Sequence, residues 1–328
     1  MRMIFNDIKG FVLKNYLLFL IGFLTVSLSV GGAKTGNLLF NAGFEDVGYV
    51  YDWKTSGCGV KQVSGSGQVC SGKLAASFKL SKGKESAFIE NKCPRIRVVP
   101  GETFELSVMA KGRGTLSLGC AMLGGTPMRL KGLGVVSSKP VKLDDTWRRI
   151  VFTHTFTKRD ILEFSYRIQL QGQGAEVQLD DATLVQVLKR KADFKAPSGN
   201  YMVYPGQRVE IKVAVSYKDD KSHADLAVVP MNFPASRVSW NKDSGELTVN
   251  IPVQSAGKTL RLDLFDRTSG IGRQVYLDAV SRSQYQAVER VMKEQVKPAR
   301  NLNVLVLGDS LSDLYRGQNY VDLLTFWT

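Results

Sequence analysis

The stretch PGETFELSVMAKG, Pro100 to Gly112, decides how this chain folds. It opens on a Pro-Gly turn signal, and the residues that follow alternate between apolar and polar side chains. The apolar members of the alternation are Phe104, Leu106, Val108 and Ala110. A period of two residues is typical of a strand with one buried face, so the stretch predicts a half-buried antiparallel strand.

The same alternation continues on both sides of this stretch, from Asn37 to Leu188, with Gly and Pro residues between the runs. Positions that share a face are Leu116, Leu118 and Cys120, then Ile150, Phe152, His154 and Phe156, then Leu162, Phe164, Tyr166, Ile168 and Leu170. About 150 residues of strand pattern without a convincing helix predict a jelly-roll β-sandwich over residues 37–188. His154 lies among apolar neighbours, which indicates a hydrogen-bonded core histidine.

A second β-rich unit follows a basic connector, LKRKADFKAP, which ends in proline and predicts a linker over residues 189–197. Short alternating runs then fill residues 198–280, which favours a small immunoglobulin-like β-sandwich. This unit contains no cysteine and no cluster of catalytic residue types. We expect it to be a spacer or a docking unit, and a second binding module is the alternative.

Composition limits the classes of partner. The chain has 328 residues, enough for two or three domains, a formal net charge of +14 and a pI near 9.6. A charge of this size favours a polyanionic neighbour such as an acidic glycan, a nucleic acid or an anionic lipid. Lys and Arg are scattered through the strands and turns, so we expect no specific nucleic-acid binding.

The amino terminus has the layout of a secretory signal peptide over residues 1–33. Basic residues precede an apolar run from Tyr16 to Val30, and small residues follow, with cleavage expected after Ala33. An uncleaved anchor is the alternative, although the run is shorter than the roughly 20 residues that span a bilayer. The chain is therefore expected to be exported, to the periplasm, the cell surface or the medium, and to contact membrane only through this segment.

The four cysteines, Cys58, Cys70, Cys93 and Cys120, all lie in the first β-rich unit. In an oxidising compartment this predicts two disulfides, with all three connectivities open. Zinc is the rival interpretation, and the lack of any C-x-x-C pair disfavours it.

The carboxyl-terminal part has a different pattern. Ser281 and Gln284 form a capping-box pair at the start of a helix expected over residues 281–297, and Pro298 follows it. An apolar run from Val304 to Leu307 then leads into Gly308, Asp309, Ser310 and a helical pattern. A strand, a turn with a serine and a helix predict the start of an α/β domain over residues 301–328, and that domain is expected to be incomplete.

The first unit resembles the jelly-roll carbohydrate-binding modules of families 4, 9 and 22. The matching elements, in the family's order, are NLLFNAGFED (37–46), Trp53, PGETFELSVMAKG (100–112), DTWRRIVFTHTF (145–156) and AEVQLDDATLV (175–185). The resemblance implies a galactose-binding-like sandwich that often binds β-glycans in a cleft or at its loops and often carries a structural calcium ion. It makes a polysaccharide the expected partner.

Two sets of candidate site residues follow. Tyr49, Tyr51 and Trp53 form an aromatic cluster that could support a sugar ring, although Trp53 and Trp147 are also natural core residues. The candidate calcium ligands are Glu45, Asp180 and Asp181, because calcium prefers carboxylate and carbonyl oxygens. The alternative for these carboxylates is simple solvation.

The terminal segment VLVLGDSLSD, Val304 to Asp313, resembles the first block of the SGNH (GDSL-type) hydrolases, serine esterases with a flavodoxin-like fold. The resemblance implies that Ser310 is the nucleophile and that its backbone N–H contributes to the oxyanion hole, with no cofactor for catalysis. The family's two later oxyanion-hole blocks and its Asp-x-x-His base are missing, since no histidine follows Ser310. A serine without a base is a poor nucleophile, so we expect this chain to be inactive as an esterase.

Two functions of different classes result. The first is the amino-terminal part of a secreted esterase that acts on carbohydrate esters and carries a glycan-binding module. The second is a non-catalytic exported surface protein that binds glycan or another protein through its sandwiches.

Overall fold

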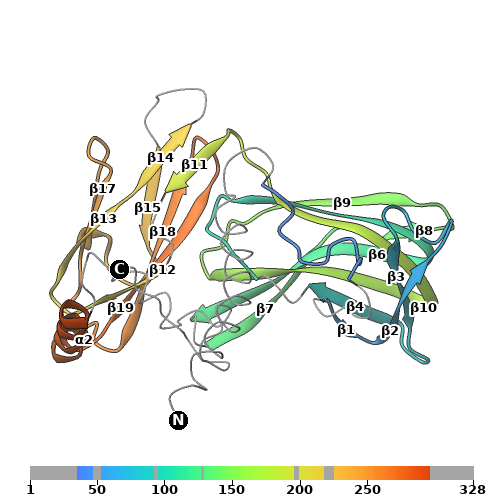
Figure 1. Cartoon of the computed structure of the whole chain (residues 1–328), viewed down its shortest axis with the longest axis horizontal. Coiled ribbons are helices and arrows are strands. Elements are labelled where there is room, and N and C mark those ends of the chain that lie inside the picture. The colour runs from blue at the N-terminus through green and yellow to red at the C-terminus, as the bar shows by residue number, and fades with distance from the viewer. Residues whose placement is uncertain are drawn as a thin grey trace, which may run out of the picture.

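The computed structural model describes residues 35–46, 53–91, 95–126, 129–195, 199–217 and 225–295. This part of the chain is almost entirely β, as the sequence predicted. It forms two β-rich units, which lie side by side in Figure 1.

The first unit is one continuous network of antiparallel strands. Its members are β1 (Trp53–Ser56), β2 (Cys58–Ser64), β3 (Leu74–Leu80), β4 (Ser86–Asn91), β5 (Ile96–Arg97), β6 (Thr103–Thr126), β7 (Arg129–Ser137), β8 (Val141–Leu143), β9 (Arg148–Thr155) and β10 (Ile161–Gln186). The path of hydrogen-bonded strands runs β1-β4-β10-β3-β2, and β6 pairs with β10, β7, β8 and β9.

Two long strands, β6 and β10, belong to both layers of this sandwich. Residues 115–123 of β6 pair with residues 163–171 of β10 in the layer that includes β1, β4 and β7. Residues 104–113 of β6 pair with residues 176–186 of β10 in the layer that includes β2, β3 and β9. Where the two halves of β6 meet, Gly112 and Gly114 have φ of 123° and 132°, and the β10 register shifts between Gln171 and Glu176. Glycine adopts such angles without the steric cost of a side chain, so the strands can bend from one layer into the other.

The core between the layers comes from the alternation seen in the sequence. Phe104, Leu106, Val108 and Ala110 are all buried, and they pack in one cluster with the inward side chains of β3, β4, β9 and β10. The predicted β-sandwich is therefore confirmed for this unit.

The second unit has smaller sheets and its own core. Its strands are β11 (Ala192–Lys195), β12 (Gly199–Val203), β13 (Arg208–Lys212), β14 (Ala214–Tyr217), β15 (Leu226–Pro230), β16 (Val238–Asn241), β17 (Glu246–Asn250), β18 (Lys258–Asp266) and β19 (Gly272–Ala279), with a 3-10 turn at Ala235–Arg237. The sheets have the orders β12-β19-β18-β15, β13-β17-β16 and β11-β14, and β12 runs parallel to β19. One hydrophobic cluster joins these three sheets, and the unit is called the second sandwich below. Part of the expected linker is strand β11, because Ala192 and Phe194 are buried in this cluster.

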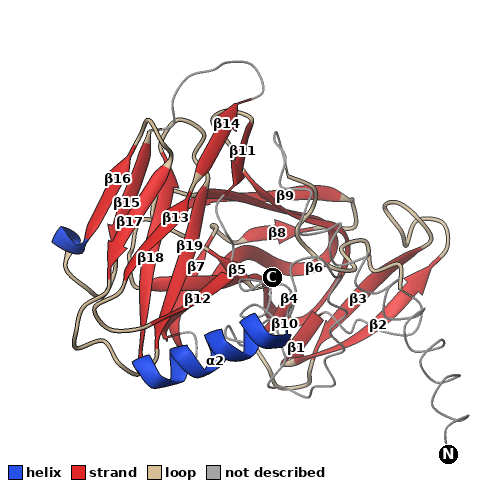
Figure 2. Cartoon of the chain, turned by 60° about the vertical axis from the view of Figure 1, so that its left-hand side comes forward, coloured by secondary structure: helices blue, strands red, loops and turns tan. Residues whose placement is uncertain are grey.

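One α-helix, α2 (Arg282–Gln295), follows the last strand in the described part of the chain. Its capping box forms as predicted: the Ser281 N–H donates to Gln284 Oε1 (3.0 Å) and the Gln284 N–H donates to Ser281 Oγ (3.2 Å). Tyr285 lies against Tyr204, with ring centroids 4.9 Å apart, so the helix packs on the second unit (Figure 2). The described residues show no α/β domain, and the segment 301–328 lies outside them. No helix among the described residues is long and apolar enough to cross a membrane.

Candidate functional site

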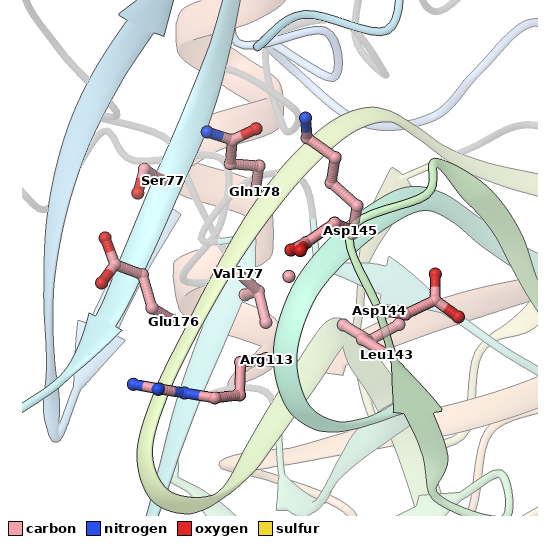
Figure 3. Close-up of a pocket in the computed structure, with 10 residues that line it drawn as sticks. Ser77, Arg113, Leu143, Asp144, Asp145, Glu176, Val177 and Gln178 are labelled. Atoms are coloured by element: carbon pink, nitrogen blue, oxygen red, sulfur yellow. The ribbon is translucent and has the colours of Figure 1, made fainter. Parts of the chain in front are cut away.

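A polar pocket of about 630 Å³ lies on the outward face of the layer formed by β3, β10 and β6 (Figure 3). Its lining residues are Ser77, Lys111, Gly112, Arg113, Leu143, Asp144, Asp145, Glu176, Val177 and Gln178. Most of them can donate or accept hydrogen bonds, whereas Leu143 and Val177 are buried members of the core cluster beneath the pocket.

Strand register explains why these side chains meet. Gln178 pairs with Ser77 of β3 on one side and with Lys111 of β6 on the other, so the three form a row across three strands. The next outward position of β10, Glu176, pairs with Lys79 and Arg113 in the same way. Residues between these positions point into the core, because successive side chains of a strand alternate between its faces.

Ion pairs and hydrogen bonds hold the charged side chains around the pocket. Glu176 forms an ion pair with Lys79 (3.1 Å), and Arg113 donates to the carbonyl of Gly174 (2.9 Å). Lys111 donates to the carbonyl of Gly67, and its ammonium group lies 5.1 Å from the ring centroid of Trp147. These contacts fix the orientation of the donors before any ligand arrives, which lowers the entropy cost of binding.

Two polar atoms at this site are buried without a partner among the described residues: Gln178 Oε1 and Trp147 Nε1. A buried polar atom that makes no hydrogen bond costs about 1–3 kcal/mol. A ligand hydroxyl or an ordered water at Gln178 would remove that cost. Because Gln178 Oε1 has almost no accessible surface, a ligand reaches it only once the Gln178 side chain turns toward the pocket, beside the ammonium of Lys111 on the neighbouring strand.

The aromatic platform expected from the sequence does not form at Trp53. Trp53 is 3% exposed, its ring packs against Phe44 and Tyr166, and its indole Nε1 donates to the carbonyl of Asn41 (3.2 Å). Trp53 is therefore a core residue, which was the alternative interpretation of the sequence. Burial of its large apolar surface stabilises the folded state more than exposure to solvent would. Tyr49 and Tyr51 lie outside the described residues.

The three candidate calcium ligands do come together, around the loop at residues 70–74. Asp180 accepts from the N–H groups of Cys70 (2.9 Å) and Ser71 (3.0 Å). Glu45 accepts from the N–H of Lys73 (3.0 Å), and Asp181 accepts from the hydroxyl of Ser71 (2.7 Å). Burial raises the pKa of Asp180, and its bonds from backbone N–H groups act in the opposite direction.

This arrangement does not fit a calcium ion as it stands, because hydrogen-bond donors point at the oxygens that a cation would need. Among the described residues, no group of three or more His, Cys, Asp or Glu side chains could hold a metal ion. Structural calcium stays a prediction.

The expected disulfides are not present among the described cysteines. Cys58, Cys70 and Cys120 are all free, and Cys93 lies outside the described residues. Cys120 is fully buried in the middle of β6, where burial raises the pKa of its thiol to about 12. Cys120 occupies a core-facing position of β6, and its side chain packs in the first hydrophobic cluster. It therefore acts as a small apolar core residue.

His154 differs in part from its expectation. It is half-buried on β9 and lies beside the rings of Phe152 and Phe156, with centroid distances of 6.1 Å and 4.8 Å. No hydrogen bond links its side chain to another described residue, so ring contacts hold it in place.

The esterase motif at Ser310 lies outside the described residues. His223 does follow Asp220 with Asp-x-x-His spacing, but this tetrapeptide precedes the serine, whereas the GDSL-type hydrolases place theirs after it. The segment with His223 also lies outside the described residues.

The fold and the pocket together define a β-sandwich protein with a preorganised polar surface site. No protein-family model matches the sequence, and no curated protein matches it. Similarity is found among solved structures.

TmCBM61 in complex with beta-1,4-galactotriose is 20% identical over 46% of this chain and 98% of that chain, with a TM-score of 0.34. The CBM22-1 xylan-binding domain from Paenibacillus barcinonensis Xyn10C is 16% identical over 48% of this chain and 96% of that chain, with a TM-score of 0.36. The enzymatically active domain of Bacteriophage CBA120 tailspike protein 4 is 11% identical, with a TM-score of 0.37, over 46% of this chain. The match spans only 21% of the tailspike chain. These similarities give no support to the resemblance with GDSL-type hydrolases.

Proposed function

We propose that the first sandwich is a non-catalytic glycan-binding module whose ligand occupies the pocket at Ser77, Lys111 and Gln178. The observation that carries the proposal is the row of hydrogen-bonding side chains across three paired strands, in which Gln178 Oε1 is buried without a described partner. The sequence resemblance to carbohydrate-binding modules supports it independently.

The chemistry of the pocket suits a sugar. Sugar hydroxyls both donate and accept, so they can satisfy the Gln178 amide, the Ser77 hydroxyl and the Lys111 ammonium group at once. Ligand pockets usually enclose about 300–1,000 Å³, and the 630 Å³ here is within that range. Arg113 and Glu176 at the next register position add a charged pair that can orient a second sugar unit.

Affinity electrophoresis of the full chain in soluble xylan, β-glucan and galactan tests the proposal. We expect retardation in at least one of them, and a loss of about tenfold in affinity for Gln178→Ala. Gln169→Ala is the matched control, because Gln169 lies on the same strand in the other layer, paired with Phe88 and Ser117. No retardation in any glycan, or an equal loss in both variants, would overturn the pocket as the site.

We also propose that the two sandwiches precede the nucleophile segment of a carbohydrate esterase. The sequence VLVLGDSLSD around Ser310 supports this proposal. We expect the 328-residue chain to show no turnover of p-nitrophenyl acetate, since no histidine follows Ser310 in it. Turnover that Ser310→Ala abolishes would contradict this expectation. A His223→Ala variant then shows whether the upstream Asp-x-x-His supplies the base.

Export is proposed on the layout of residues 1–33, and the second sandwich is proposed to hold the first at a fixed distance from whatever follows it. Amino-terminal sequencing of the protein recovered from a secreting host tests the first point. A new terminus just after Ala33 is the expected result, and an intact Met1 in membranes would favour the anchor alternative.

A further inference from the structure

A second pocket, of about 350 Å³, lies where the two sandwiches meet. Leu133 of β7, Leu162 of β10 and Arg159 line it from the first sandwich, and Met231, Arg261 and Tyr276 line it from the second. Nothing in the proposed glycan site involves these residues, so this pocket is a separate feature.

Hydrogen bonds between the sandwiches position the side chains that form the inner wall of this pocket. The Gln274 amide nitrogen donates to the carbonyls of Val98 (2.6 Å) and Leu162 (2.8 Å), and its amide oxygen accepts from the Tyr276 hydroxyl (2.6 Å). Arg261 donates across the junction to the carbonyl of Ile161 (3.4 Å). Because Gln274, Tyr276 and Arg261 are all buried, the inner wall is preformed.

The charges around the pocket are unbalanced. Arg261 is already paired with Asp263, through two contacts of 2.6 Å and 2.8 Å. Lys131 and Arg159 are exposed at the rim, and neither forms a hydrogen bond or an ion pair with another residue in the described ranges. Two carboxylates lie near these three cations: Asp160 in the lining and Asp263, which pairs with Arg261 and also interacts with the charge of Arg159. Lys131, Arg159 and Arg261 therefore leave a surplus of one positive charge.

The remaining lining is apolar on one side and polar on the other. Leu133, Leu162 and Met231 present aliphatic surface, which suits the C–H face of a pyranose ring. An arginine binds a carboxylate or a sulfate through paired N–H groups, with more specificity than a neutral ligand allows. The formal charge of +14 on the whole chain would also attract a polyanionic polymer.

We propose that the junction pocket binds an anionic sugar unit, with Lys131 and Arg159 contacting its carboxylate or sulfate group and the aliphatic side chains covering its ring. A ligand there touches both sandwiches and stabilises their contact. The chain then carries two sites of different chemistry, one for neutral sugar hydroxyls and one for an anionic sugar.

Calorimetric titration of the full chain with an oligoglucuronate and with a sulfated galactan oligosaccharide tests the proposal. We expect at least one of them to bind, and the double variant Lys131→Gln/Arg159→Gln to weaken that binding by about tenfold or more. Binding of the oligoglucuronate identifies the carboxylate as the group that is recognised, and binding of the sulfated ligand identifies the sulfate.

The control pair Lys139→Gln/Lys142→Gln removes the same charge from exposed positions that do not line either pocket. We expect it to keep the affinity within about twofold. An equal loss in both pairs would show general charge attraction and overturn the site, as would a lack of binding to both anionic ligands. Affinity for a neutral glycan should be unchanged in the double variant, so a failure at this pocket is distinguishable from a failure at Gln178.

Discussion

At the scale of single residues, Trp53 shows how burial decides between two roles that look alike in a sequence. Its ring contacts Phe44 and Tyr166 and its indole nitrogen is bonded, so truncation removes packing and a hydrogen-bond donor. We expect Trp53→Ala to lower the free energy of unfolding by about 3–5 kcal/mol, measured by urea denaturation. Trp53→Phe should cost less and should keep full glycan affinity. Lost affinity at unchanged stability would restore the platform interpretation.

His154 predicts how stability changes with pH. Burial beside two phenylalanine rings lowers the pKa of His154 below its ordinary value of 6.5. The folded state therefore binds this proton less tightly than the unfolded state does, and the contribution of His154 is full above pH 6.5 and is lost as the pH falls. Urea titrations at about pH 7.5 and pH 5 should show a larger drop for the wild type than for His154→Gln. Equal drops would mean that His154 is not perturbed.

At the scale of elements, the strand pattern was predictable but its continuity was not. In the sequence, the alternating runs at residues 100–112 and 116–120 are successive runs separated by glycine. In the structure they are one strand, β6, since the positive φ of these glycines lets it bend between layers.

The candidate site was missed for a related reason. Lys111 and Gln178 occupy polar positions in strands whose apolar and polar residues alternate. Polar residues at such positions usually face solvent and bind nothing. Only the pairing of β10 with β3 and with β6, which are distant in sequence, brings Gln178 beside Ser77 and Lys111. The polar positions in the stretch AEVQLDDATLV were the available signal, but a strand register was needed to interpret it.

The bend in β6 can be tested with one methyl group. A Cβ on Gly112 would overlap the carbonyl oxygen of Glu176 and lie 2.9 Å from Val177 Cα, at a φ that side chains avoid. We expect Gly112→Ala to cost about 2–4 kcal/mol and to weaken glycan binding, because Gly112 lines the pocket. Gly132→Ala on β7 is the matched control, since its Cβ would meet nothing within 4 Å. Similar losses in the two variants would contradict a special role for the bend.

At the scale of the whole molecule, a buried polar junction ties the two sandwiches together. Glu102 is 3% exposed and accepts from the N–H of Gly272 in the second sandwich (2.8 Å) and from the Gln186 amide (2.7 Å). Burial raises the pKa of Glu102, and the charge of Arg273 acts in the opposite direction. Each sandwich has its own hydrophobic cluster, and we expect this junction to couple the unfolding of the two.

Gly272 is the residue through which this coupling is most directly tested. A Cβ at Gly272 would overlap Val99 Cγ2 and lie 2.9 Å from the Glu102 carboxyl carbon, so a single methyl group would push the sandwiches apart at their contact. In scanning calorimetry we expect one cooperative transition for the wild type and two separated transitions for Gly272→Ala, because each core would then melt by itself. Gly59→Ala on β2, whose Cβ would meet nothing within 4 Å, should keep the single transition. Two transitions in the wild type, or one in Gly272→Ala with an unchanged midpoint, would show that the junction does not couple the sandwiches. Gly272→Ala should also lower the affinity for the anionic sugar and leave the affinity at the Gln178 pocket unchanged. Only the anionic-sugar pocket is lined by residues of both units.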